Sequence, residues 1–358
     1  MRKRVGLIGG GVLVSAAIAL AIPLAANAQT PSVPATSNGV TQTNLVSDQP
    51  GKAQLTDPHL INAWGASEGP ATPLWVSNTG TSTSTLYAGS LGSTPASITP
   101  LVVNIPGGPP TGQVFNDTTS FDLPGTTTPA RFIFAGLGGS ITAWAGGTVA
   151  TVAAHQAGSV YTGLALAHSP SGPLLLGADF ATGKVDVFDS TFTKLPADGL
   201  FQDNNLPEGY APFNVTELGG KVYVTYAKVD PTTHREVKKP GDGFVDAYTT
   251  DGAFIQRLAS HGLLDAPWGV AIAPANFGAF SGDLLVGNFG NGRISALNPQ
   301  TGHFIGPVTD ASGKPIVIDG LWALLVGNTA IGGPDSILFT AGPDNETHGL
   351  VGKLTANN

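Results

Sequence analysis

Cysteine is absent from this chain of 358 residues, and only 11% of the residues are charged. The lack of cysteine excludes disulfide bonds and zinc sites built on thiolates, so stability must come from packing and strand pairing. The low content of charged residues disfavours a helical protein, because exposed helix positions favour Glu and Lys. Turn formers are abundant instead, with 49 glycines and 28 prolines. This composition is typical of a chain with many turns and broad contacts between sheets.

Basic residues are too few for a partner that carries negative charge. The chain has 16 basic and 24 acidic residues, which gives a formal net charge of −8. A surface of this sign repels nucleic acid and anionic lipid, and we therefore expect neither as a partner.

The first 28 residues have the pattern of a secretory signal peptide. Three basic residues at positions 2–4 precede an apolar run over positions 5–25, and Ala26-Asn-Ala supplies the small residues of a cleavage site. A membrane anchor is the alternative, but the cleavage site favours a signal that is removed. We expect a secreted or periplasmic protein with no membrane anchor after signal removal. Residues 29–44, rich in Pro, Ser and Thr, predict a disordered lead-in.

A pattern of three strands recurs six times along the rest of the chain. Each copy has a short inner strand, an apolar second strand and an alternating third strand, and the turns between them leave no room for a helix. The second strands are predicted to begin at Leu74, Phe132, Leu174, Val222, Leu284 and Ile337. One such unit cannot bury both faces of its own sheet, so the copies must stack on one another.

Five of the six copies are followed by a fourth strand, which the last copy lacks. The segment 43–46 has the character of the missing strand, and placing it beside Leu350–Leu354 would close a ring and cover an exposed sheet edge. We therefore predict an all-β fold, a six-bladed β-propeller in which residues 45–358 form a single domain closed by an N-terminal strand. An open β-solenoid or two sandwiches are the alternatives, but repeats of about 40–60 residues favour the propeller.

Two resemblances support this fold. Pro267-Trp-Gly-Val and Asp283-Leu-Leu-Val-Gly-Asn-Phe-Gly-Asn-Gly-Arg-Ile resemble NHL-type six-bladed propellers. The chain after position 28 also resembles a family of exported bacterial proteins described as conserved hypothetical. The segments that carry this resemblance include Leu60-Ile-Asn-Ala-Trp-Gly and Phe339-Thr-Ala-Gly-Pro-Asp-Asn-Glu-Thr-His-Gly-Leu. The second resemblance implies a propeller fold and export, and it implies no activity because that family has none assigned.

Polar residues recur where the inner strands of a propeller approach the axis. The positions are Asn62, Gln113, Tyr161, Asn214, Trp268 and Trp322, with Asn116 and Asp319 nearby. The amide oxygens of Asn62, Asn116 and Asn214 suit Ca²⁺, which takes oxygen ligands. The alternative, and the commoner role, is that such amides satisfy backbone groups in a crowded centre. The tryptophans at positions 64, 268 and 322 are expected to act as wedges between blades.

Carboxylates at the ends of the inner strands suggest chemistry. Glu68, Asn116 and Glu217 are assigned to one strand position in three blades, where a metal and a carboxylate base could hydrolyse a substrate. The segment Glu68-Gly-Pro also resembles the metal-binding Glu-Gly-Pro of gluconolactonase-like propellers. Exposed carboxylates that end strands are the commoner case. His348, with Asp344 and Glu346, is a further candidate base or ligand, unless it bonds within its own turn.

The longest insertion, residues 230–243, carries the only basic cluster after position 28. It predicts either a contact element or a solvated hairpin tip.

Two functions remain open at this stage. The first is a binding scaffold that takes an unknown ligand or protein at a propeller face, because the strong catalytic spacings are missing. The second is a metal-assisted, lactonase-like hydrolase with Ca²⁺ at the channel mouth. We expect a monomer in either case.

Overall fold

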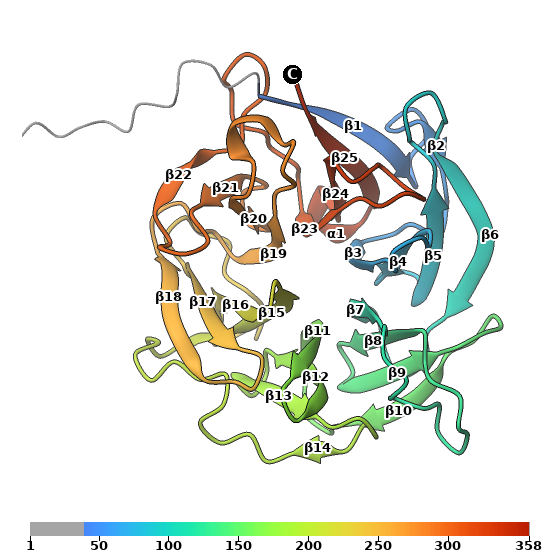
Figure 1. The fold of residues 1–358 in the computed structure, drawn as a ribbon, viewed down its shortest axis with the longest axis vertical. Helices are drawn as coiled ribbons and strands as arrows, with labels where there is room; N and C mark the ends of the chain where they lie inside the picture. The colour runs from blue at the N-terminus through green and yellow to red at the C-terminus, as the bar shows by residue number, and fades with distance from the viewer. Residues whose placement is uncertain (1–38, 358) are drawn as a thin grey trace, which may run out of the picture. The chain divides into compact units, whose positions relative to one another are not determined.

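The computed structural model describes residues 39–357. The predicted signal peptide and the lead-in up to residue 38 lie outside the described residues. Six β-sheets stand around one axis, and the chain passes through them in order (Figure 1). The predicted six-bladed β-propeller is confirmed. No helix within residues 39–357 has the length and apolar character of a membrane span.

Each blade contains four strands that lie side by side from the axis to the rim, and one sheet has a short fifth strand. The innermost strands are β3 (Ala63–Ser67), β7 (Pro110–Phe115), β11 (Tyr161–Ser169), β15 (Tyr210–Leu218), β19 (Pro267–Ile272) and β23 (Leu321–Val326). The second strands are β4 (Leu74–Asn78), β8 (Phe132–Gly136), β12 (Gly172–Asp179), β16 (Lys221–Lys228), β20 (Leu284–Asn288) and β24 (Ser336–Ala341). We number the blades one to six in this order.

The outer half of each blade follows the same order. The third strands are β5 (Thr83–Ala88), β9 (Ser140–Trp144), β13 (Lys184–Phe188), β17 (Gly243–Thr249), β21 (Ile294–Leu297) and β25 (Leu350–Ala356). The outermost strands are β6 (Ser97–Asn104), β10 (Thr151–His155), β14 (Lys194–Leu195), β18 (Phe254–Ser260), β22 (Phe304–Pro307) and, in blade six, β1 (Val40–Ser47). The remaining elements are β2 (Leu55–Thr56), the single turn η1 (Gly278–Phe280) and α1 (Pro343–Glu346).

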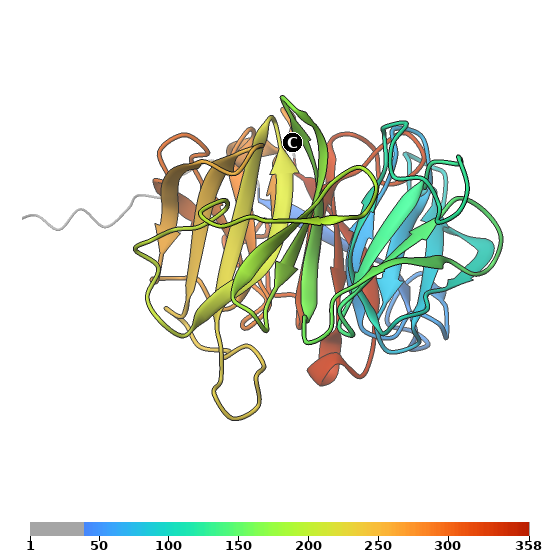
Figure 2. The ribbon, with the colours of Figure 1, turned by 90° about the horizontal axis from the view of Figure 1, so that it is seen from below.

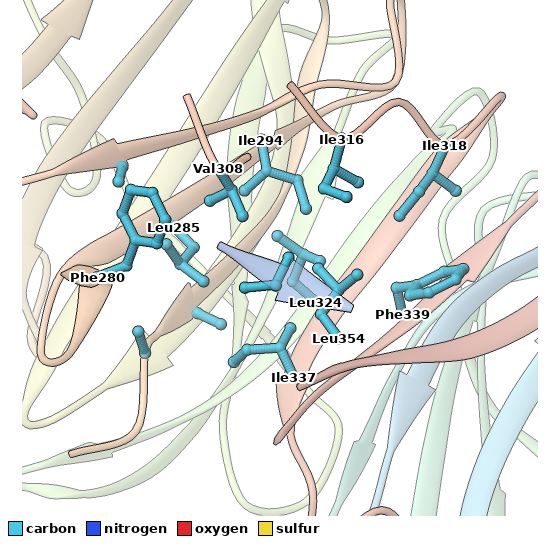
Figure 3. Close-up of a cluster of buried hydrophobic side chains, with 14 of the residues drawn as sticks. Phe280, Leu285, Ile294, Val308, Ile316, Ile318, Leu324, Ile337, Phe339 and Leu354 are labelled. Atoms are coloured by element: carbon cyan, nitrogen blue, oxygen red, sulfur yellow. The ribbon is translucent and has the colours of Figure 1, made fainter. Parts of the chain in front are cut away.

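Burial explains why the second strands are continuous apolar runs. Every residue of β4, β8 and β20 is buried, because a neighbouring blade covers each face of these strands. The outermost strand β18 begins with two exposed residues and is only partly buried, since one side faces solvent. The core therefore consists of clusters between neighbouring blades. Figure 3 shows one of them, in which Leu285 and Ile294 of blade five pack with Ile337 and Leu354 of blade six.

The N-terminal strand closes the ring as predicted. β1 pairs antiparallel with β25, with Thr43 opposite Lys353 and Val46 opposite Val351. This strand begins at Val40, so the predicted domain start after residue 44 is too late, and residues 40–44 are strand rather than disordered lead-in. The short strand β2 pairs with β1 in parallel, which makes this sheet five-stranded, and the sequence pattern did not predict it.

Glycine permits the blades to meet at the axis. A Cβ atom on Gly112 of blade two would collide with the backbone of Gly163 and Leu164 in blade three. A Cβ on Gly163 would in turn collide with Asn214 of blade four. The inner strands therefore approach to backbone contact, which only a residue without a side chain allows.

Candidate functional site: an acidic funnel at one end of the axis

Aromatic rings close one end of the axis. The Trp322 ring stacks on Trp64 with centroids 3.7 Å apart and on Phe289 at 3.8 Å. It also meets Phe213 at 5.8 Å and the edge of Trp268 at 5.9 Å. Because these rings come from blades one, four, five and six, they must meet on the axis. The tryptophans thus form a buried central plug, whereas the sequence suggested wedges between adjacent blades.

Asn62 belongs to this closed end. Its Oδ1 accepts a hydrogen bond from Trp322 Nε1 at 2.9 Å, and its Nδ2 donates to Glu346 Oε2 at 3.1 Å. The residue has a φ of 48°, a left-handed conformation that Asn tolerates better than most residues. The side chain of Asn62 therefore links the plug to the turn of α1.

The long insertion lies on the same end. Arg235 Nη2 lies 2.8 Å from Glu346 Oε1, and Lys238 Nζ lies 4.1 Å from the centre of the Phe289 ring. Figure 2 shows this loop, between β16 and β17, projecting from the same side of the ring as α1. Two of its basic residues thus cover the plug through an ion pair and a cation–π contact.

A funnel opens at the opposite end of the axis. It has a volume of about 840 Å³ and is lined by residues at or near the ends of all six inner strands. Its two walls differ in character. All of its titratable side chains, Glu68, Asp117, His168 and Glu217, come from blades one to four, which also contribute apolar residues such as Phe115 and Leu166. Blades five and six contribute mainly aliphatic residues, among them Val270, Ile272, Leu324 and Val326.

His168 connects three blades at the polar wall. Its Nε2 lies 2.9 Å from Asp117 Oδ1, and its Nδ1 lies 3.7 Å from Glu217 Oε2. The hydrogen bond to Asp117 is the main reason why the pKa of His168 is raised above its usual value. Glu217 is held in turn by the Gly220 N–H, which donates to its Oε1 at 2.8 Å. Because the His168 side chain is 50% exposed, this group remains accessible from solvent.

Glu68 lies in a drier part of the same wall. Burial raises its pKa from 4.5 to about 8. Its Oε2 is buried and accepts no hydrogen bond within residues 39–357. The following turn is fixed from blade six, since Asn328 Nδ2 donates to Gly69 O at 2.7 Å and to Thr72 O at 2.9 Å. Glu68 thus lies between strand β3 and a turn that Asn328 holds in place, and its Oε2 has no hydrogen-bond donor among the described residues.

Gln113 presents a second unmet acceptor in the funnel lining. Its side chain is 5% exposed, and its Nε2 donates to Gly65 O and Trp75 O of blade one. Its Oε1 is buried and has no partner in the described part of the chain. Unmet buried acceptors are uncommon in folded proteins and indicate a place for a donor from outside the chain.

The structure does not gather the three amides predicted to bind a metal. Asn214 lines the funnel and donates to Trp268 O at 2.9 Å, whereas Asn62 lies at the closed end. Asn116 does not line the funnel, and its Nδ2 donates to Ser120 O and Ala130 O, each at 2.8 Å. These residues do not fit a shared Ca²⁺ site. Across residues 39–357, no three His, Asp or Glu residues form a group that could hold a metal ion.

The three residues predicted to act in catalysis do not lie together either. Glu68 and Glu217 both line the funnel, but His348 lies beside the closing strand, with its Nδ1 2.7 Å from Asp48 Oδ2. Asp48 also accepts the Gly349 N–H at 2.8 Å, so this histidine and its carboxylate fasten the ring closure. The partners suggested for His348, Asp344 and Glu346, are not the residues it bonds.

Strand register corrects one alignment and exposes a missed pair. Phe132 and Val222 occupy equivalent positions, since the second strands of blades two and four were predicted to begin at them. Phe115 pairs with Phe132 and Glu217 pairs with Val222, so Phe115 rather than Asn116 is the counterpart of Glu217. Asp117 and His168 were not singled out from the sequence, although they are the only ion pair at the funnel whose atoms lie within 3 Å among the described residues. Their positions at the ends of two neighbouring inner strands are the signal that would have found them.

Comparison with known proteins places the chain in a family. It is 34% identical over 330 residues to the uncharacterized protein R648 of Acanthamoeba polyphaga mimivirus, covering 87% of this chain and 78% of the relative. The chain belongs to this family. A second member, uncharacterized protein L690 of the same virus, is 39% identical over 201 residues, 55% of this chain and 51% of that protein. No family model matches the chain. These members are viral, whereas the sequence resemblance pointed to bacterial proteins.

Solved structures show the fold of this family. A structural genomics protein of unknown function from Bacteroides thetaiotaomicron has a TM-score of 0.55 at 13% identity, covering 89% of this chain and 76% of that chain. A glucose dehydrogenase has a TM-score of 0.54 at 13% identity, covering 88% of this chain and 100% of that chain. At this level of identity the likeness concerns the propeller fold alone.

Proposed function

We propose that this propeller is an exported binding scaffold that takes a small organic ligand in the funnel. The observation that carries the proposal is that every titratable side chain of the funnel lies on the side of blades one to four, opposite an aliphatic surface from blades five and six. Ligand sites in proteins have this composition, a mostly apolar cavity with a few placed polar groups. The volume of about 840 Å³ lies within the range of sites for small molecules.

The polar groups are suited to binding because they are held in place before a ligand arrives. Asp117 and Glu217 hold His168 from either side, and Asn328 fixes the turn after Glu68. A preorganised site loses less side-chain entropy on binding.

Export rests on the signal-peptide pattern of residues 1–28, and mass spectrometry of protein secreted by a bacterial host would test it by the loss of that segment.

Blocking the funnel tests the proposal. Val326→Trp places a large ring on the aliphatic wall, and Val149→Trp makes the same change at a residue that is 57% exposed and does not line the funnel. A library of small molecules would be screened by native mass spectrometry and by thermal shift against both variants and the wild type. We expect ligands that bind the wild type and Val149→Trp and lose at least tenfold in affinity with Val326→Trp.

Two outcomes would overturn the proposal. One is a library that yields no ligand for the wild-type protein. The other is a set of ligands that bind Val326→Trp as tightly as the wild type. Far-ultraviolet circular dichroism and melting temperatures of both variants establish that each is folded before binding is compared.

A further inference from the structure

The funnel lining contains three carboxyl groups and one histidine as its titratable groups. Asp117 and Glu217 lie on either side of His168, Glu68 lies in the same lining, and the described lining contains no lysine or arginine. His168 can neutralise only one carboxylate, and it is already 2.9 Å from Asp117. The charge of Glu217 remains, and Glu68 adds a second negative charge when it ionises. Both lie in a concave, partly apolar site, where field lines attract a cation more strongly than on a flat surface.

Unmet acceptors make a second, independent argument. Glu68 Oε2 and Gln113 Oε1 are both buried, and neither accepts a hydrogen bond within residues 39–357. Both oxygens can accept hydrogen bonds, and an ionised Glu68 can do nothing else. A ligand rich in N–H donors would satisfy both atoms, whereas an anionic ligand would add acceptors to a site that already has too many.

The opposite wall defines the rest of the ligand. Val270, Ile272, Leu324 and Val326 provide aliphatic surface and no charge. A bare inorganic cation would leave this wall in contact with water. A ligand with an apolar body would bury this wall and gain the free energy of removing apolar surface from water.

We propose that the ligand of the funnel is an organic ammonium ion with an apolar body, whose N–H groups face Glu68 and Gln113. This inference rests on the proposed function and narrows it to one class of ligand. Burial raises the pKa of Glu68 to about 8 in the empty funnel, and a bound ammonium favours the ionised carboxylate. Asp117, His168 and Glu217 are the other titratable groups that line the site.

A series of probes with one ring and three charges tests the inference. Phenethylammonium, phenylpropanamide and phenylpropanoate share a phenyl ring and differ in the charge of the polar end. Binding would be measured by isothermal titration calorimetry and by the change in tryptophan fluorescence, to which Trp268 contributes from the funnel lining. We expect the ammonium to bind at least about tenfold more tightly than the amide, and the carboxylate more weakly than the amide.

Variants and pH separate a specific contact from general attraction. Glu68→Gln should weaken the ammonium about tenfold and change the amide less than twofold, while Glu208→Gln, at an exposed residue outside the funnel, should change neither. Wild-type affinity for the ammonium should rise from about pH 6 to about pH 9 as Glu68 ionises, and this rise should be smaller in Glu68→Gln. If Glu68→Gln does not fold, Glu217→Gln serves as the second variant, with the same expected direction.

The outcomes distinguish this inference from the proposed function. If the amide or the carboxylate binds as tightly as the ammonium, the charge argument is refuted while binding in the funnel stands. If no probe binds but members of the broader library do, the ligand class is wrong and the funnel proposal stands. If binding of the ammonium is insensitive to both Glu68→Gln and Glu217→Gln, the proposed contacts are wrong.

Discussion

The pH dependence of stability at Glu68 provides a direct test of the funnel's polar wall. The pKa of this carboxyl group is raised by burial from 4.5 to about 8. In the unfolded chain the proton leaves at the lower value, and in the folded protein it leaves at the higher one. Between these values the unfolded state binds fewer protons, so the free energy of unfolding falls as pH rises, and it levels off above about pH 8.

The size of the effect follows from the width of that window. One pKa unit corresponds to about 1.4 kcal/mol, so the full shift sets an upper limit of about 5 kcal/mol. The Glu68 side chain is not completely buried, and water that reaches it reduces the penalty. We therefore expect about 2–3 kcal/mol.

The perturbation is Glu68→Gln, which keeps the shape and removes the titration. Urea unfolding curves of wild type and variant would be recorded from about pH 4 to about pH 9. The two proteins should have similar stability at the acidic end, and the variant should be more stable by about 2–3 kcal/mol at the basic end. Burial also raises the pKa of Asp246 to about 7 and of Asp283 to about 6, but both titrate in wild type and variant and cancel in the difference.

Glu208→Gln is the matched control, because it makes the same chemical change on an exposed residue. It should shift stability by less than about 0.5 kcal/mol at every pH. Parallel curves for wild type and Glu68→Gln would refute the conclusion that Glu68 is held protonated in a dry part of the funnel.

Three further predictions concern the frame that supports the funnel. Trp322→Ala removes a ring that is 0% exposed and stacked on two others, and should lower the free energy of unfolding by about 3–5 kcal/mol in urea; a loss below about 1 kcal/mol would contradict a packed plug. Arg257→Met leaves Asp246 and Asp203 without their cation and should lower the free energy of unfolding in urea by about 3–5 kcal/mol near neutral pH. The loss should be smaller in acid, where the carboxyl groups are protonated, and an equal loss at both pH values would count against the ion pair. Deleting residues 40–47 removes three fully buried aliphatic side chains and should lower the free energy of unfolding by about 5–9 kcal/mol, enough to abolish cooperative unfolding. A peptide of those residues added in trans should restore cooperative unfolding, and unchanged unfolding of the truncated chain would contradict the closure.

The parts of the fold that the sequence predicts best are the strands buried on both faces. The second strands at Leu74, Phe132 and Leu284 begin where their apolar runs begin, because both faces of these strands are covered and the first three residues of each are apolar. The rim is less regular. Every residue of β10 is exposed or partly exposed, and β2 has only two residues, and such strands carry a weak hydrophobic pattern.

The site is harder to predict because it depends on register and on contacts between blades. Glu68 and Glu217 were found because each ends an inner strand. Asn116 was misaligned since Thr111-Gly112 replaces the Trp-Gly pair that marks the inner strands of blades one and five. The contact of Asp117 with His168 joins residues 51 apart in sequence, and it depends on how far β11 extends past its neighbour, which composition and spacing do not encode.

The closing strand has a consequence for the order in which the protein can mature. Ser47 Oγ donates to Gly349 O across 302 residues, so the final sheet draws on the start and the end of the polypeptide. A ribosome delivers β1 early and β25 last, so this strand must wait without its partner while the other five blades are made. Pairing between segments so far apart in sequence is slow to form. Until it forms, β1 exposes unpaired backbone N–H and C=O groups, to which a strand of a neighbouring copy can pair.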